Sequence, residues 1–587
     1  MAFSVRIHIP QGTICFEAEE NARLMDILTN AGTPVNAPCG GRGFCGKCRV
    51  IVRGHLSEMT PEEARFFTKD EIRAGYRLAC AARILGEAEI TIPEEAGAVI
   101  VTESHGGTIA LDSGYSLFPV RVPAPSLSDQ RGDDERLLAA LGFANGITLS
   151  AARALPSAVR AETTWALLRD GNVLAVSDAP LSALGVAVDI GTTTIVAYLL
   201  DLLTGERLAT SSRLNPQRQF GADVISRADH ARTSENSLFE EAECVRRTLC
   251  EMVREMLQKE NLPEEAVYEY ALAGNTIMMH LFAGISPEHI AVTPFIPAYT
   301  GGMTVSAKEV GLIPQDARVS LLPCVAGYVG ADTVAAMLAC DMDEAEGVSL
   351  LLDIGTNGEI ALGGRDGILC CSAAAGPAFE GAHIHCGTGA IEGAIDHVRV
   401  DGGKISYTTI AGVEPIGICG SGLVDAIAQL LDAYVIDETG RIDEDEAPEE
   451  MLCDFEGKCA VKIAESIVLT QKDVREVQLA KGAIAAGIEI LMREMGVTDM
   501  DIRKVFLAGG FGSFIQKESA CRIGLIPASL LSKIEPVGNA AGAGAQRHVL
   551  NRSAASRMEN LRKKATYLEL SAIRSFQELF AEKMLFE

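Results

Sequence analysis

Residues 184–206 read LGVAVDIGTTTIVAYLLDLLTGE, and residues 349–367 read SLLLDIGTNGEIALGGRDG. Each stretch is an apolar strand, an aspartate, a Gly-Thr turn and a second apolar strand, which predicts a β-hairpin with a bend large enough for a phosphate group. A strand that ends in glycine before a helix follows each hairpin, as ALAGNTIMMHLF at 271–282 and KVFLAGGFGSFI at 504–515. The repeat predicts two half-domains of the same construction.

The residues of these turns suit phosphate binding. Glycine at each bend lets the main chain approach phosphate oxygens, and the adjacent threonine and asparagine residues supply N–H and hydroxyl donors. Asp189 and Asp353 can hold Mg²⁺ through water, and the glycines at the later bend leave room for adenosine or phosphate. One such turn alone also fits a buried strand, but two copies with the AGGFG bend favour a nucleotide site. The predicted nucleotide-binding residues are Gly191, Thr192, Thr193, Thr194, Gly355, Thr356, Asn357, Gly509, Gly510 and Gly512.

A second kind of chemistry lies near the N-terminus, where residues 36–48 read NAPCGGRGFCGKC. Cys39, Cys45 and Cys48 have the spacing Cys-x5-Cys-x2-Cys, and Cys80 follows in the segment YRLACAAR. Thiolates are the soft ligands of iron–sulfur clusters, and glycines let backbone N–H groups turn toward the cluster sulfurs. The pattern resembles the [2Fe-2S] ferredoxins. A structural zinc site is the alternative, but such sites usually show two Cys-x2-Cys pairs and this chain has one.

The chain length and its local patterns divide the sequence into four parts. At roughly 150 residues per domain, 587 residues predict three or four compact units. Strands at 3–8 and 13–18 and a helix at 23–31 predict a small β-rich domain around the cysteines. We expect a ferredoxin-like domain at 1–94, a linker at 95–116, a small α/β middle domain at 117–181 that could mediate dimerisation, and a two-lobed domain at 182–587.

The charge balance excludes several classes of partner. The 51 Lys and Arg residues face 79 Asp and Glu residues, so the formal net charge is −28, and such a chain repels nucleic acid and anionic membrane surfaces. The sequence lacks both an apolar run long enough to cross a bilayer and a secretory signal. We therefore expect a cytoplasmic protein whose 16 cysteines are reduced thiols and metal ligands.

The two hairpins and the AGGFG bend resemble the superfamily of actin, the sugar and acetate kinases and the heat-shock chaperone ATPases. The resemblance implies two ribonuclease-H-like lobes that close on ATP. In that superfamily a helix before the second phosphate motif often carries the carboxylate that orients the attacking water, and Asp332 occupies that place, 21 residues before Asp353. The alternative role of Asp332 is a helix N-cap. The stretch GNAAGAGAQ at 538–546 is expected to be a hinge helix between the lobes.

The whole chain resembles the reductive activators of corrinoid proteins, through the segments LAGNTIMMHL, LLDIGTNGEIAL, AAAGPAFEGAHI, GICGSGLVDAIAQLL and FLAGGFGSFI. The resemblance implies a multidomain α+β and α/β protein: an N-terminal β-grasp [2Fe-2S] domain, a small middle domain and a C-terminal actin-like ATPase domain. It implies that the protein reduces the Co(II) corrinoid of a methyl-transfer protein to Co(I). An upstream low-potential donor would supply the electron, and ATP hydrolysis would be coupled to partner binding or release. The resemblance also favours a homodimer.

Several alternatives stay open from the sequence. The acceptor could instead be a radical dehydratase or another low-potential protein, or the chain could be a nucleotide-switched binding module that senses redox state. Ser372 and Glu380 lie in a glycine-rich segment that either contacts the partner's corrinoid or forms a buried turn between lobes. Cys386 and Cys419 are either structural or ligands of an added [4Fe-4S] cluster, as the resemblance to the dehydratase activators implies.

Overall fold

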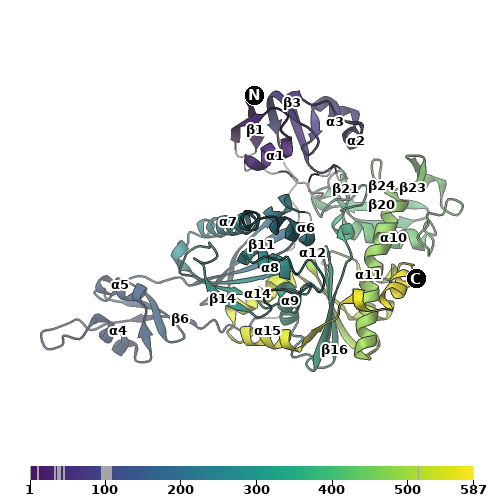
Figure 1. The fold of residues 1–587 in the computed structure, drawn as a ribbon. Helices are drawn as coiled ribbons and strands as arrows, with labels where there is room; N and C mark the ends of the chain where they lie inside the picture. The colour runs from purple at the N-terminus through teal and green to yellow at the C-terminus, as the bar shows by residue number, and fades with distance from the viewer. Residues whose placement is uncertain are drawn as a thin grey trace.

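The computed structural model of the chain describes residues 2–586 except 10–11, 32, 34, 36–40, 42, 44–45, 94–108, 222 and 513. Cys39, Cys45 and most of the predicted linker lie outside the described residues. Figure 1 shows the N-terminal domain above a large two-lobed body, with a small domain extending from the first lobe to the left of the view. Within the described residues, no helix is both long and apolar enough to span a bilayer.

The N-terminal domain is a five-stranded sheet in the order β2-β1-β5-β3-β4. Strand β1 runs antiparallel to β2 and parallel to β5, and Val5 and Ile7 point from β1 into the core. This arrangement confirms the predicted β-grasp fold. Its elements are β1 (Ala2–Ile9), β2 (Gly12–Glu19), α1 (Leu24–Asn30), β3 (Arg49–Leu56), α2 (Pro61–Ala64), α3 (Lys69–Ala74), β4 (Tyr76–Leu78) and β5 (Ile84–Thr91).

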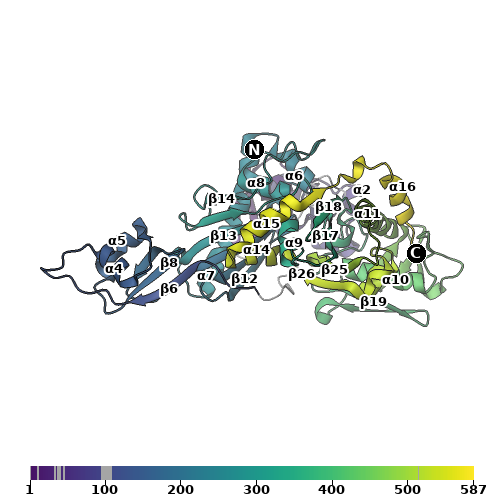
Figure 2. The ribbon, with the colours of Figure 1, turned by 90° about the horizontal axis from the view of Figure 1, so that it is seen from below.

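The small domain that follows is a four-stranded sheet in the order β6-β8-β9-β7 with two helices. Figure 2 shows that it extends away from the body of the molecule. The Tyr115 hydroxyl at the start of this sheet donates a hydrogen bond to the Glu269 carboxylate of the first lobe at 2.9 Å. The elements are β6 (Tyr115–Val120), α4 (Asp133–Leu141), β7 (Gly146–Ile147), α5 (Leu149–Ala158), β8 (Thr164–Arg169) and β9 (Asn172–Ser177).

The first lobe is built on a six-stranded sheet in the order β12-β11-β10-β13-β15-β14. Strand β10 pairs antiparallel with β11 and parallel with β13, so the predicted hairpin forms the centre of the sheet. The elements are β10 (Leu184–Ile190), β11 (Thr194–Asp201), β12 (Arg207–Leu214), α6 (Val224–Ala231), α7 (Glu235–Lys259), β13 (Val267–Gly274), α8 (Thr276–Ala283), β14 (Met303–Ser306), β15 (Arg318–Leu321) and α9 (Ala331–Ala339).

The second lobe repeats this plan with a six-stranded sheet in the order β26-β25-β16-β17-β18-β27. Strand β16 pairs antiparallel with β17 and parallel with β25, which matches the pairing of β10 and confirms the predicted repeat. The strands are β16 (Val348–Ile354), β17 (Gly358–Gly364), β18 (Gly367–Ala373), β25 (Ile502–Ala508), β26 (Ile534–Gly538) and β27 (Ala565–Tyr567).

Two three-stranded sheets complete the second lobe, and a set of helices belongs to the same half of the chain. The sheets are β20-β19-β21 and β22-β23-β24, with β19 (Ala394–Asp401), β20 (Lys404–Thr409), β21 (Gly417–Ile418), β22 (Leu452–Phe455), β23 (Lys458–Lys462) and β24 (Val468–Thr470). The helices are α10 (Gly420–Asp432), α11 (Gln471–Met495), α12 (Gly509–Gly512), α13 (Lys517–Arg522), α14 (Ala540–Leu550), α15 (Ser553–Lys564) and α16 (Phe576–Lys583).

Helices α9 and α14 lie at the junction of the two lobes (Figure 1). They cross very closely, because a Cβ atom on Gly544 of α14 would lie 2.0 Å from the Ala335 carbonyl oxygen of α9. Small residues permit such a close approach of two backbones. The predicted helix at 538–546 therefore exists as α14, and its small residues serve this crossing.

Candidate functional site

A cavity of about 2700 Å³ opens between the two lobes and reaches the N-terminal domain. The carboxyl ends of β10 and β16 meet at it, so the two Gly-Thr turns face one cavity. Of the residues predicted from the sequence, those that line it are Asp189, Gly191, Thr192, Thr193, Thr194, Asp332, Asp353, Gly355, Thr356, Asn357, Glu380, Gly509 and Gly510. The N-terminal domain contributes lining residues that include Gly46, Lys47 and Phe66.

Two predicted residues lie elsewhere. Gly512 sits at the end of α12, where an added Cβ would meet the Leu507 side chain at 3.1 Å, so it packs on its own strand instead of lining the cavity. The Ser372 side chain lies on β18, and its hydroxyl is 3.5 Å from the Glu359 carboxylate of the adjacent strand. Ser372 therefore contacts a residue of the cavity wall and not the cavity itself.

Four carboxylates gather at the base of the cavity: Asp189, Asp332, Asp353 and Glu359. Removal from bulk water raises the pKa of Asp189 to about 7, and the charges of Asp332 and Asp353 add to the effect. Burial and the charge of Asp332 raise the pKa of Asp353 to about 7 as well. Carboxylates that repel one another in this way are stabilised in their charged form by a divalent cation, and their oxygens are the ligands Mg²⁺ prefers.

Asp332 lies in the first turn of α9, and its carboxylate accepts a hydrogen bond from the Thr333 backbone N–H at 2.7 Å. The N-cap of this helix is Gly330, so the alternative role of Asp332 as the N-cap is wrong. Burial raises the pKa of Asp332 to about 6. A carboxyl group with such a pKa can exchange a proton near neutral pH, which suits a group that orients and deprotonates water.

Three residues outside the predicted set hold the first Gly-Thr turn in place. The Asn215 amide donates to the Gly191 carbonyl at 2.8 Å, and the Arg227 guanidinium donates to the Thr192 carbonyl at 2.7 Å. The Asn275 amide donates to the Thr192 hydroxyl at 3.1 Å. Asn275 directly follows the strand-to-glycine motif at 271–274, so its position was a usable signal.

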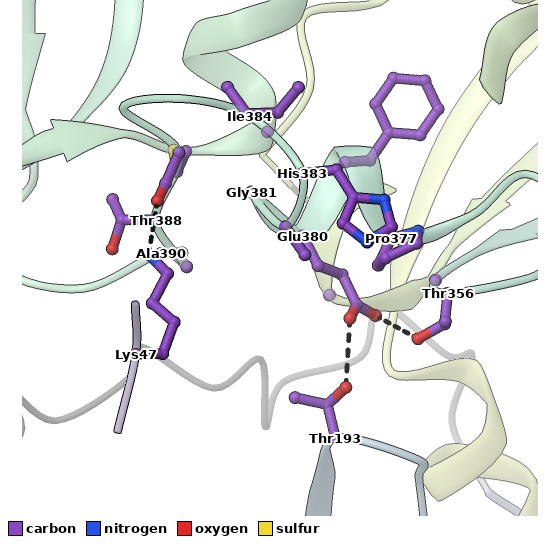
Figure 3. A pocket seen from close by; sticks show the side chains of 18 of the residues that line it. Lys47, Thr193, Thr356, Pro377, Glu380, Gly381, His383, Ile384, Thr388 and Ala390 are labelled. Atoms are coloured by element: carbon purple, nitrogen blue, oxygen red, sulfur yellow. Dashed lines mark hydrogen bonds between the residues drawn. The ribbon is translucent and has the colours of Figure 1, made fainter. Parts of the chain in front are cut away.

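A single carboxylate joins the two Gly-Thr turns. Glu380, at the end of a short 3₁₀ helix (Pro377–Glu380), accepts a hydrogen bond from the Thr193 hydroxyl at 3.2 Å and another from the Thr356 hydroxyl at 3.0 Å. Figure 3 shows both bonds, with the two threonines approaching from different lobes. Removal from bulk water raises the pKa of Glu380. Its two threonine partners lie 187 and 24 residues away in the sequence, so the glycine-rich segment around Glu380 did not indicate them.

The two described cysteines of the predicted cluster site lie together inside the N-terminal domain. Cys48 and Cys80 are both buried. A hydrogen bond with Cys80, together with burial, raises the pKa of the Cys48 thiol above its ordinary value. A buried pair of adjacent sulfurs fits a metal cluster, since metal binding replaces the thiol protons. Cys39 and Cys45 complete the predicted set from residues outside the described part of the chain.

Cys386 and Cys419 both line the cavity. The Cys419 thiol is buried and donates to the Ile395 carbonyl at 3.2 Å, which is a structural contact. Cys386 is half-buried, and the Ser466 carbonyl accepts a long contact of 4.0 Å from its thiol.

The N-terminal domain contacts the second lobe at this cavity. The Lys47 ammonium group, one residue before Cys48, donates a hydrogen bond to the Gly387 carbonyl of the second lobe at 3.1 Å. Figure 3 shows Lys47 reaching the loop that carries Thr388 and Ala390. Lys47 thereby attaches the start of the Cys48 segment to the wall of the cavity between the lobes.

Comparison with known families covers nearly the whole chain. Family profiles match a 2Fe-2S iron-sulfur cluster binding domain at residues 7–85, the RACo linker region at 104–176, the RACo middle region at 184–345 and the C-terminal, ASKHA domain of RACo at 347–587. These matches confirm the predicted combination of a ferredoxin-like domain with an actin-like one.

Individual relatives agree with these profiles. The chain is 30% identical to the corrinoid activation enzyme RamQ of Eubacterium limosum, over 97% of each chain. It is 28% identical to the [Co(II) methylated amine-specific corrinoid protein] reductase of Methanosarcina barkeri, over 68% of this chain and 76% of that one. A solved structure of a reductive activator for corrinoid, iron-sulfur protein covers 100% of this chain and 98% of its own, with 30% identity and a TM-score of 0.74.

Proposed function

We propose that this chain, which belongs to the RACo family of corrinoid activation enzymes, is an ATP-dependent reductase of a corrinoid protein. The reaction adds one electron to the inactive Co(II) corrinoid of a methyl-transfer protein and yields Co(I). A low-potential cellular reductant supplies the electron, and hydrolysis of ATP is coupled to binding or release of the partner. The relatives named above act on corrinoid proteins according to their names, which supports this class of partner.

One observation carries the proposal: residues of the ferredoxin-like domain and of both phosphate turns line a single cavity. An electron carrier alone needs no nucleotide. A transfer to an acceptor of lower potential needs a second source of free energy, and ATP provides it when it binds two conformations with different affinity. The attachment of Lys47 to the second lobe gives this coupling a physical route.

We assign the residues as follows. Cys39, Cys45, Cys48 and Cys80 would hold a [2Fe-2S] cluster, which supplies a one-electron carrier at a typical potential of about −400 mV. The two phosphate turns bind the triphosphate of ATP, and Asp189 and Asp353 hold Mg²⁺ through water. The Asp332 carboxylate orients the attacking water and accepts its proton.

The test is anaerobic mixing of the reduced protein with a Co(II) corrinoid protein while the Co(I) absorption band is recorded with and without Mg-ATP. The proposal expects a Co(I) band that depends on ATP. A band of equal size without ATP contradicts it, and so does the absence of Co(I) under both conditions.

Two features of the assembly belong to the same proposal. We expect the partner to be the corrinoid protein of a methyltransferase system, identified by an anaerobic pull-down with the holoprotein. We also expect a homodimer, which light scattering on the eluted protein tests directly.

A further inference from the structure

The Glu380 carboxylate occupies two hydroxyl donors that a bound nucleotide phosphate would use. The Thr193 and Thr356 hydroxyls come from the phosphate turns of opposite lobes, and both donate to the Glu380 carboxylate. The carboxylate also lies over the second turn, because a Cβ on Gly355 would be 3.8 Å from its Oε1 atom. A carboxylate that bridges two hydroxyl donors presents negative charge and acceptor oxygens to them, as a phosphate group does.

The segment after Glu380 leads directly to the ferredoxin-like domain. Gly381 has a left-handed φ of +76°, and a Cβ there would lie 2.3 Å from the Thr388 carbonyl oxygen. A Cβ on Gly387 would in turn lie 2.1 Å from the Gly381 carbonyl oxygen. The backbone at Gly381 is therefore packed against the backbone at 387–388, and a movement of one displaces the other.

Gly387 is also the acceptor for the ferredoxin-like domain, since its carbonyl receives the Lys47 ammonium group at 3.1 Å. Figure 3 shows Glu380, Gly381, Thr388 and Lys47 in this order from the centre to the left of the view. Glu380 is bonded to Gly381, and the Gly381 backbone packs against Gly387, which accepts the hydrogen bond from Lys47. Two steps therefore connect the Glu380 carboxylate with the contact of the ferredoxin-like domain.

We propose that Glu380 is an internal stand-in for a nucleotide phosphate, and that its displacement by ATP detaches the ferredoxin-like domain from the second lobe. The inference rests on the proposed binding of ATP to this cavity. A triphosphate and Glu380 compete for the same two hydroxyls and repel each other. When the phosphate takes the hydroxyls, Glu380 leaves with Gly381, the contact at 387–388 shifts, and Lys47 loses its acceptor. The detached domain is then free to approach a partner protein.

The first test measures the affinity of the full-length holoprotein for a non-hydrolysable ATP analogue with Mg²⁺. Glu380→Gln keeps the size of the side chain and one acceptor but removes its charge. If Glu380 competes with phosphate for the two hydroxyls, this variant should bind the analogue about 5-fold or more tightly than the unchanged protein. Glu476→Gln is the matched control, because Glu476 faces His383 of the same segment at 3.9 Å, and its affinity should equal that of the unchanged protein.

Equal or weaker binding by Glu380→Gln overturns the inference, because a residue that helps to hold the nucleotide would give weaker binding. If the unchanged protein fails to bind the analogue at all, the proposed function falls together with the inference. Binding by the unchanged protein without a gain in Glu380→Gln removes the inference alone.

The second test measures hydrogen exchange by mass spectrometry over residues 46–56 and 381–391. Adding the analogue to the holoprotein should increase exchange in both segments. Lys47→Met should produce the increase in both segments without nucleotide, while Lys69→Met, a change of an exposed lysine in the same domain, should not. The visible spectrum confirms that each variant retains its cluster. Exchange that stays constant or falls on adding the analogue overturns the proposed detachment.

Discussion

Replacing Gly544 by alanine tests the junction of the lobes, next to the carboxylates that we propose to act on ATP. The added methyl group would lie 2.0 Å from the Ala335 carbonyl oxygen, whereas ordinary contact begins at 3.4 Å. Backbone atoms cannot rotate away, so helices α9 and α14 must separate by about 1.4 Å to remove the clash. The same substitution at an open helix position would stabilise the protein by about 1 kcal/mol. A loss of stability would therefore indicate the clash between the two helices.

The magnitude follows from these two opposing contributions. Overpacking costs about 1–3 kcal/mol, and a clash with backbone atoms lies in the upper part of that range. After the gain of about 1 kcal/mol in helix propensity, we expect a net loss of about 1–2 kcal/mol. Asp332 lies one turn before Ala335 on α9, and Asn539, which caps α14, donates to the Asp189 carboxylate at 3.0 Å. Separation of the helices therefore moves two groups of the cavity, and a displacement of about 1 Å can lower a rate by about 100-fold.

The assay compares thermal unfolding by circular dichroism with the rate of Mg-ATP hydrolysis. Gly544→Ala should lower the unfolding midpoint by about 2–5 °C and the hydrolysis rate by about 10- to 100-fold. Gly487→Ala is the control, because the three atoms nearest its added methyl belong to side chains. The closest is the end of the Ile360 side chain, at 2.7 Å. A Gly544→Ala protein that is as stable and as active as the unchanged one would refute the reasoning.

Two further predictions concern the carboxylates and the separation of the two sites. Asn539→Ala removes a hydrogen bond that favours ionised Asp189, so the pKa of Asp189 should rise above about 7. The acidic limb of the pH–rate profile for ATP hydrolysis should then move to higher pH. A limb that does not move would contradict the contact. Cys48→Ser should remove the visible absorbance while nucleotide affinity is retained, and Asp353→Ala should lower hydrolysis by about 100-fold or more with the absorbance intact. Loss of the absorbance in Asp353→Ala would contradict independent folding of the two modules.

The sequence predicted those parts of the fold that local patterns determine. The hairpin at 184–206 was predictable because alternating apolar runs and a Gly-Thr turn are encoded within some twenty residues. The contact of Thr193 with Glu380 spans 187 residues and that of Asn539 with Asp189 spans 350, so only tertiary packing determines them. Gly512 shows a second limit, since glycine spacing alone does not determine which glycines of the bend line the cavity.

The charge of the cavity constrains how a nucleotide can enter it. Asp189, Asp332, Asp353 and Glu359 line its base, and Glu380 lies at the phosphate turns, in a chain whose formal net charge is −28. A bare triphosphate would be repelled by those of the five carboxyl groups that are ionised, and desolvation deep in the molecule makes that repulsion stronger than in water. Binding is favourable only when a divalent cation neutralises the acids and the phosphates together. Chelation of divalent cations should therefore abolish nucleotide binding, measured by calorimetry. The visible absorbance of the holoprotein should persist under the same conditions. Undiminished binding in the presence of chelator would contradict the assignment of Asp189 and Asp353 to Mg²⁺.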